Sequence, residues 1–480
     1  MKTTLSVIVS FFLLTMLIGA VSGATFSAPA QTKPSPISNS KPTSSTSVTS
    51  SQSQDANKNN KTTKVPDDGT SSTVIKNEGL EPVFFGAHMH RIVLRSNETQ
   101  AYVPTQWPSS NVKIGSLRLW DSTTRWADIA PKAGVWNFDR LDAYVAKAQA
   151  NGAEILYTLG STPQWASARP YEVCPYGFGC SAEPVRLAHW EEYVRRVVTR
   201  YKGRIKAYEI WNEPKFSDIP RDRGAHAFFT GSVKDMVALA SSAYKIIKEI
   251  DPDALVLTPG FTNGADRLDM YLKAGGVSYV DGITYHFYAS SAKEMFSHIH
   301  QVRQVMENNG VSHLPLWNTE DGVFLKLEGP QTMAGEKATI SEVTALAAQH
   351  FIISAASNIQ RLYYYAWDNI NSGMVNPQGG PMPLFNIMVQ MQSWLMGTKV
   401  AECTNLAAST YACEAVQNGQ SYIFAWSDRP GGYKLTLPTG FFAVGMQSAD
   451  LSVAPITIPK TNILNVSLSA MPVRIRLETQ

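Results

Sequence analysis

Two short segments carry carboxylates in settings suited to acid–base and nucleophilic chemistry. Residues 208–214 contain Asn212-Glu213-Pro214, and residues 315–322 contain Glu320 followed by Asp321. Each group follows a short apolar run typical of a strand. Two carboxyl groups about 5–5.5 Å apart can act as proton donor and nucleophile, as retaining glycoside hydrolysis requires. Glu213 and Glu320 are therefore the candidate catalytic pair.

Other carboxylates compete with this pair. Asp321 is a weaker candidate for the nucleophile, and Glu294 is a further decoy. Glu213 could simply begin a helix, but its Asn and Pro neighbours at a strand end favour catalysis. Glu209 lies two residues before Trp211 on the strand itself, so we interpret it as a barrel-interior residue paired with a base such as Arg118.

Eight apolar runs alternate with amphipathic helices through the middle of the chain. In one helix, apolar residues at i, i+3, i+4 and i+7 follow Asp139, the predicted cap. This alternation over roughly 300 residues predicts an α/β fold, a closed (β/α)8 TIM barrel. An open doubly wound sheet is the alternative, but the first run lacks its glycine-rich turn. The eight runs are 83–87, 116–120, 155–159, 206–211, 255–258, 282–286, 315–319 and 362–367.

The barrel also explains how the two glutamates would meet. They end the fourth and seventh runs, and active sites of this fold form at the carboxyl ends of the strands. Strands four and seven lie on opposite sides of the barrel mouth. We therefore expect Glu213 and Glu320 to face each other across a ligand.

The two ends of the chain have different patterns. Residues 1–23 resemble a signal peptide, with a short basic start, an apolar run and small residues after it. A retained membrane anchor is the alternative, but the apolar run is shorter than the roughly 20 residues that a span needs. Residues 24–77 are rich in Ser, Thr and Pro, which predicts a disordered linker. The barrel is predicted over 78–395 and an all-β sandwich over 396–480. The expected location is secreted or periplasmic.

The cysteines and the net charge indicate which covalent links, metal sites and binding partners to expect. The four cysteines form two close pairs, which in an exported chain predicts two disulfides, with free thiols as the alternative. Neither pair has zinc-ligand spacing, so we expect no metal site. A net charge of +3 without a basic block argues against nucleic acid. No protein partner is indicated, and a monomer is expected. The pairs are Cys174/Cys180 and Cys403/Cys413.

An ordered set of motifs resembles retaining barrel glycoside hydrolases with glutamates on strands four and seven. It is most similar to glycoside hydrolase family 39, and within it to bacterial endoglycosidases associated with exopolysaccharides. The likeness covers about residues 80–400. The motifs are Leu117-Arg118-Leu119-Trp120, Trp136-Asn137-Phe138-Asp139, Asn212-Glu213, Tyr285-His286-Phe287-Tyr288 and Glu320.

The resemblance implies a role for each matching position. Glu213 would be the acid/base and Glu320 the nucleophile. Asn212 would bind the sugar hydroxyl next to the anomeric carbon. Tyr288 or His286 would hold the nucleophile, and Arg118 would keep Glu320 ionised. Trp367 would form a floor for a sugar ring.

Several other side chains have both a binding and a packing interpretation. His88 or His90 would line the sugar pocket or sit in the core. Trp165 and Trp120 would either stack on sugar rings or pack in the core. Asp121 and Asp368 would bind sugars or cap helices.

These observations together predict a retaining glycoside hydrolase without metal or organic cofactor. We expect endo-action on a β-linked polysaccharide, with an exo-acting β-xylosidase-like enzyme as the alternative. A surface glycan-binding protein without turnover is the alternative from another class. The C-terminal sandwich would be either a carbohydrate-binding module or a structural brace.

Overall fold

The computed structural model describes residues 79–93, 105–108, 111–223, 227–323, 339–369, 372–376, 378–407, 409–451, 458, 460 and 462–479. The predicted signal peptide (1–23) and linker (24–77) lie outside these residues. No helix in the described ranges is long and apolar enough to span a membrane.

Eight parallel strands form one sheet in the order β7-β6-β3-β2-β1-β10-β9-β8. Bridges from Leu257 to Gly282 and from Phe261 to Tyr285 join its two end strands, so the sheet closes into a barrel. The closed barrel confirms the predicted fold class. The strands are β1 Phe85–His88, β2 Ser116–Leu119, β3 Glu154–Leu159, β6 Ala207–Ile210, β7 Leu255–Leu257, β8 Ile283–Tyr285, β9 Leu316–Asp321 and β10 Leu362–Tyr364.

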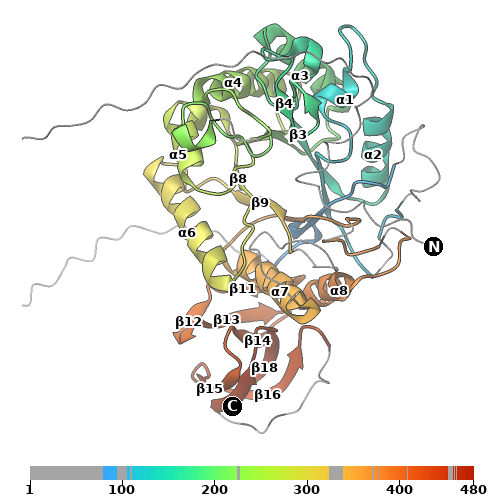
Figure 1. Ribbon diagram of the computed structural model, residues 1–480. Coiled ribbons are helices and arrows are strands. Elements are labelled where there is room, and N and C mark those ends of the chain that lie inside the picture. Colours follow the sequence, from blue (N-terminus) through green and yellow to red (C-terminus); the bar gives the residue numbers. More distant parts are fainter. Residues whose placement is uncertain are drawn as a thin grey trace, which may run out of the picture. The chain divides into compact units, whose positions relative to one another are not determined.

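A helix follows each strand from β2 onward, and these helices surround the strands (Figure 1). Asp139 is the first residue of its helix rather than the predicted cap, and Asn137 Oδ1 accepts its backbone N–H at 2.9 Å. A short helix, α1 Trp126–Ile129, precedes them. The others are α2 Asp139–Ala150, α3 Leu187–Tyr201, α4 Val233–Ile250, α5 Asp266–Lys273, α6 Ala292–Asn308, α7 Ile340–Ala356 and α8 Pro383–Leu395.

Antiparallel strands follow the last helix, as the change of pattern predicts. Six of them form one sheet, and β15 and β17 form a separate two-stranded ribbon. Leu435 and Val466 of the ribbon share a core with Ile423 and Ile475 of the sheet, which gives a two-layered arrangement. The strands are β11 Thr398–Val400, β12 Thr404–Ala407, β13 Thr410–Gln417, β14 Gln420–Ser427, β15 Gly431–Thr436, β16 Phe441–Ser448, β17 Ile463–Leu468 and β18 Val473–Thr479.

The other face of β14 packs toward the barrel helices. Phe424 and Trp426 alternate with Ile423 and Ala425 and belong to the same hydrophobic cluster as the barrel. Trp394 of α8 stacks on Phe424, with ring centroids 5.7 Å apart. Because side chains alternate along a strand, β14 contributes to two cores at once.

Candidate active site

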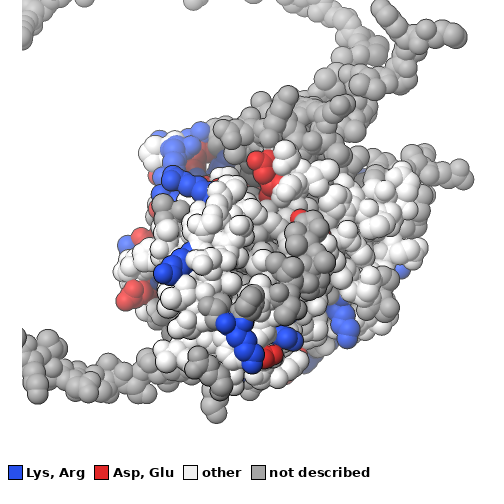
Figure 2. Space-filling view, turned by 90° about the horizontal axis from the view of Figure 1, so that it is seen from below, with Lys and Arg blue, Asp and Glu red and all other residues white. Residues whose placement is uncertain are grey.

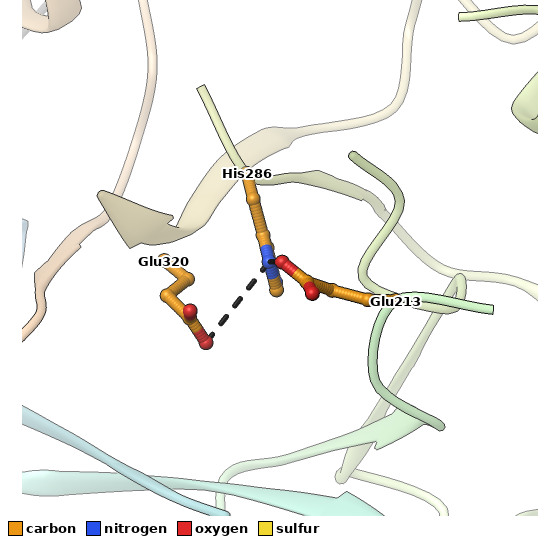
Figure 3. Close-up of side chains that lie close together, drawn as sticks. All are labelled: Glu213, His286 and Glu320. Atoms are coloured by element: carbon orange, nitrogen blue, oxygen red, sulfur yellow. Dashed lines mark hydrogen bonds and ion pairs between the residues drawn. The ribbon is translucent and has the colours of Figure 1, made fainter. Parts of the chain in front are cut away.

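Glu213 and Glu320 come together at the carboxyl ends of the fourth and seventh barrel strands. Glu213 follows β6, and Glu320 lies near the end of β9. One carboxylate oxygen of each and one nitrogen of His286 all lie within 4.8 Å of one another. Figure 3 shows the glutamates approaching from opposite sides, with the imidazole between them. The two glutamates thus face each other, the arrangement expected for residues that end the fourth and seventh strands of a barrel.

The backbone that carries Glu213 is held in an unusual conformation. Trp211 and Glu213 have φ angles of 76° and 39°, in the left-handed region. Such conformations cost about 1–3 kcal/mol each and persist where surrounding structure enforces them. Here the Glu213 N–H donates to Gly260 O at 2.9 Å. A Cβ on Gly260 would lie 2.5 Å from His286 Nε2, so glycine is required beside the imidazole.

His286 and Tyr288 contact different glutamates. His286 Nδ1 lies 2.9 Å from Glu213 Oε1 and 4.0 Å from Glu320 Oε2. The Tyr288 hydroxyl donates to Glu320 Oε1 at 2.9 Å. Either residue was expected to hold Glu320, and in the structure the hydrogen bond comes from Tyr288.

Arg118 links three polar groups inside the barrel. Its guanidinium donates to Glu209 Oε2 at 2.6 Å and to Glu320 Oε2 at 2.8 Å. It also donates to Asn212 Oδ1 at 2.6 Å, which fixes the amide next to Glu213. The expected pairing of Glu209 with Arg118 is therefore present, and so is the contact between Arg118 and Glu320.

The pKa of Glu320 is higher than a neighbouring cation alone would make it. Burial raises its pKa to about 7, although His286 and Arg118 lower it. Nearby Glu213 and Asp121 raise it further, because like charges disfavour ionisation. The expectation that Arg118 keeps Glu320 ionised took no account of the desolvation that burial brings.

The two competing carboxylates are occupied elsewhere. Asp321 is buried, and its oxygens contact His350 Nδ1 at 3.0 Å and Asn318 Nδ2 at 2.9 Å. Neighbouring strand residues point to opposite faces, so Asp321 is directed away from Glu320. Glu294 accepts hydrogen bonds from the backbone and hydroxyl of Ser290 at the start of α6.

A pair of tyrosines that the sequence motifs do not predict surrounds Asp121. Tyr176 donates to Asp121 Oδ1 at 2.6 Å and Tyr365 donates to Asp121 Oδ2 at 3.0 Å. Asp121 thus caps no helix here. Nothing in the sequence spacing links these three residues, which come from the ends of different strands.

Three predicted sugar-contacting residues are packed. Trp367 is 3% exposed, packs on Phe385 and donates its indole N–H to Gln106 O, so it offers no open floor for a sugar, contrary to the expectation. His88 is buried, and its Nε2 lies 3.1 Å from Thr319 O. Burial lowers the pKa of His88 well below its usual value. Trp165 is half-buried and donates to Ala130 O.

The remaining ambiguous residues also have packing or structural contacts. Trp120 is buried against Tyr176 and Phe228. The oxygens of Asp368 accept the backbone N–H groups of His90 and Arg91, both at 2.8 Å. Asp368 therefore organises the loop after β1.

The donor set of Glu213, His286 and Glu320 is the one group in the described residues with the spacing of a metal site. The Arg118 guanidinium already supplies a positive charge 2.8 Å from Glu320. A second cation there would be repelled by it. The arrangement therefore fits a carboxylate pair better than a metal site.

Both predicted disulfides are present, Cys174–Cys180 and Cys403–Cys413. Charges on the face seen in Figure 2 are scattered among uncharged residues rather than gathered into one basic patch in its described part. This distribution agrees with the balanced composition of the chain.

Comparison with known proteins finds similarity to glycoside hydrolases. Residues 116–265 match the model of glycosyl hydrolase family 10, a range that contains Glu213 but not Glu320. A β-1,4-xylanase of Dictyoglomus thermophilum is 28% identical over 134 residues, 28% of this chain. The match spans about a third of that relative's length (35%).

Solved structures resemble the fold more widely. A family 39 glycoside hydrolase from Bacteroides cellulosilyticus has a TM-score of 0.58 at 16% identity, over 77% of this chain and 76% of its own. A family 30 endoxylanase from Clostridium papyrosolvens has a TM-score of 0.54 at 17% identity, over 84% of this chain and 98% of its own. The fold and the family match are shared with (β/α)8-barrel glycoside hydrolases. The two glutamates lie at the carboxyl ends of the strands, where barrels of this fold form active sites. The family 39 likeness expected from the motifs appears among the structures, whereas the matching family model is that of family 10.

Proposed function

We propose that this chain hydrolyses glycosidic bonds of a β-linked polysaccharide with retention of anomeric configuration. The observation that carries the proposal is the separation of the glutamates, whose nearest ligand oxygens lie within 4.8 Å. Retaining enzymes hold their carboxyl groups about 5–5.5 Å apart, whereas inverting enzymes leave about 6.5–9.5 Å for a water.

The proposed reaction has two steps. Ionised Glu320 attacks the anomeric carbon while Glu213 protonates the departing glycosidic oxygen, which gives a covalent glycosyl ester and a free sugar end. Glu213, now ionised, takes a proton from water, and the resulting hydroxide displaces Glu320. Arg118 and Tyr288 stabilise the ionised form of Glu320 through charge and a hydrogen bond.

The assignment of roles depends on contacts rather than on acidity alone. A pKa raised to about 7 would also suit a proton donor. Glu320, however, is the glutamate of the pair that Arg118 contacts, and a neighbouring cation favours the charged nucleophile. Glu213 is paired instead with the imidazole of His286.

We propose endo-action and a polymer substrate on the evidence of relatives named xylanase and endoxylanase. An exo-acting β-xylosidase-like enzyme is the alternative within the class. A glycan-binding protein without turnover is disfavoured because both carboxylates are present and adjacent. Two disulfides support export to an oxidising compartment, where such polymers occur.

The test is hydrolysis of β-linked polysaccharides and aryl β-glycosides by the wild type, Glu213→Gln, Glu320→Gln and Glu294→Gln. We expect both active-site variants to lose about 1,000-fold or more, and Glu294→Gln, the matched control, to remain active. Product sizes from the polymer distinguish endo- from exo-action.

Azide rescue then separates the two roles. With an aryl β-glycoside, Glu213→Ala should give the β-glycosyl azide, because azide displaces Glu320 from the glycosyl-enzyme and the two displacements retain the configuration. Glu320→Ala should give the α-glycosyl azide, because azide attacks the substrate directly and the single displacement inverts the configuration. The opposite pairing of products would reverse the assignment. A wild type that binds glycan and cleaves none would refute the proposed activity.

A further inference from the structure

A small hairpin interrupts the barrel between β3 and α3. It consists of β4 Val173–Cys174 and β5 Gly177–Phe178, paired antiparallel, and the Cys174–Cys180 disulfide closes it. Tyr176 lies in its turn. The hairpin forms a two-stranded sheet of its own, separate from the eight barrel strands.

The inner side of the hairpin reaches the carboxylate pair. Tyr176 donates to Asp121 Oδ1 at 2.6 Å, and the Arg125 guanidinium lies 3.5 Å from the centre of the tyrosine ring. The negative charge of Asp121 is close enough to raise the pKa of Glu320. The hairpin is thus continuous with the wall of the proposed catalytic site.

The outer side is unusually apolar for a surface. Tyr171 is 83% exposed and Phe178 is 56% exposed. Val173, also exposed, pairs directly across the hairpin with Phe178. Among the described residues, Tyr171 and Phe178 are the two exposed aromatic side chains. Val173 and Phe178 are therefore adjacent exposed apolar side chains, and adjacent exposed apolar groups mark binding surfaces.

The segment is also held firmly in place. Thr162 N donates to Cys180 O at 3.1 Å, and Ser167 Oγ donates to Gly179 O at 2.8 Å. Arg169 bridges Glu172 at 2.8 Å and Glu183 at 2.7 Å across its base. A rigid support lowers the entropy cost of binding through exposed rings.

We propose that Tyr171 and Phe178 form a secondary binding surface for the polysaccharide, which holds sugar units beyond those between the two glutamates. The inference extends the proposed function and depends on it for the identity of the ligand. The C–H faces of pyranose rings pack on aromatic rings. Tyr176 of the same hairpin contacts Asp121, so the exposed rings belong to an insertion that borders the proposed catalytic site. The charged side chains Arg169, Glu172 and Glu183 of this segment pair with one another, so an uncharged polymer fits this surface.

The experiment compares a long and a short substrate in the full chain. Tyr171→Ala/Phe178→Ala is measured with soluble xylan and with an aryl β-xyloside, beside Leu406→Ala, an exposed apolar control (48%) on β12. We expect kcat/KM on xylan to fall about tenfold or more, with the aryl glycoside unchanged. The Leu406 variant should match the wild type on both.

Other outcomes overturn the proposal. Equal loss on both substrates would mean that the rings only support the hairpin, and no loss on xylan would mean that they bind no sugar. If the wild type cleaves neither substrate, the proposed activity fails on its own. Affinity electrophoresis in a panel of β-linked polysaccharides then decides: the double variant must be retarded less than the wild type, and equal migration of the two refutes the surface.

Discussion

His286 lies against Glu213, with Nδ1 at 2.9 Å from Oε1, and is more than an ångström farther from Glu320. The imidazole therefore belongs to the glutamate that we assign as proton donor. Its place depends on Gly260, which leaves room for Nε2.

Substitution of Gly260 by alanine should displace His286. A Cβ there would lie 2.5 Å from Nε2 and 2.9 Å from Glu209 Oε1. We expect kcat/KM to fall about 100-fold, the scale of an ångström-sized misplacement. Gly432→Ala is the control, because its Cβ would meet nothing within 4 Å. Normal activity of Gly260→Ala would show that the imidazole position is unimportant.

Tyr288→Phe should change the pH dependence. Since burial raises the pKa of Glu320 to about 7, wild-type kcat/KM should rise with pH as Glu320 ionises. The Tyr288 hydroxyl stabilises the ionised form, so its loss raises the pKa of Glu320 further. The acid limb should move upward by about one pH unit. The acid limb should stay in place for the control Tyr271→Phe. A downward shift of the acid limb in Tyr288→Phe would contradict the role of Tyr288 in stabilising ionised Glu320.

Asp321→Asn tests the neighbouring carboxylate. Its contacts with His350 and Asn318 are structural, so the variant should lose stability by about 1–3 kcal/mol and keep the wild-type kcat. Denaturant unfolding and initial rates measure the two effects. A loss of kcat comparable to that of Glu320→Gln would restore Asp321 as a candidate nucleophile.

Removal of the C-terminal strands should destabilise the barrel. Trp394 stacks on Phe424, and Gln349 Nε2 donates to Ala470 O at 2.7 Å. We expect truncation before residue 396 to give insoluble protein, and Trp394→Ala to cost about 3–5 kcal/mol. A soluble, active truncation with weaker polymer retention would instead indicate an independent binding module.

Much of the fold follows from local pattern. Apolar runs and helical periodicity predict the eight strands near their observed positions, because burial on both faces requires nearly continuous apolar sequence. Asn212-Glu213-Pro214 and Glu320 stand at strand ends, and the barrel topology alone brings those ends together. The two close cysteine pairs likewise predict both disulfides.

Contacts between distant segments are decided only in three dimensions. Three features depend on how loops from different strands pack. They are the contact of His286 with Glu213, the hydrogen bonds of Tyr176 and Tyr365 to Asp121, and the burial of Trp367. The acidity of Glu320 depends on the same packing, since desolvation and neighbouring charges act through space. Residue type and spacing thus determine which chemical groups the barrel carries, whereas packing determines which partners and which pKa each group has.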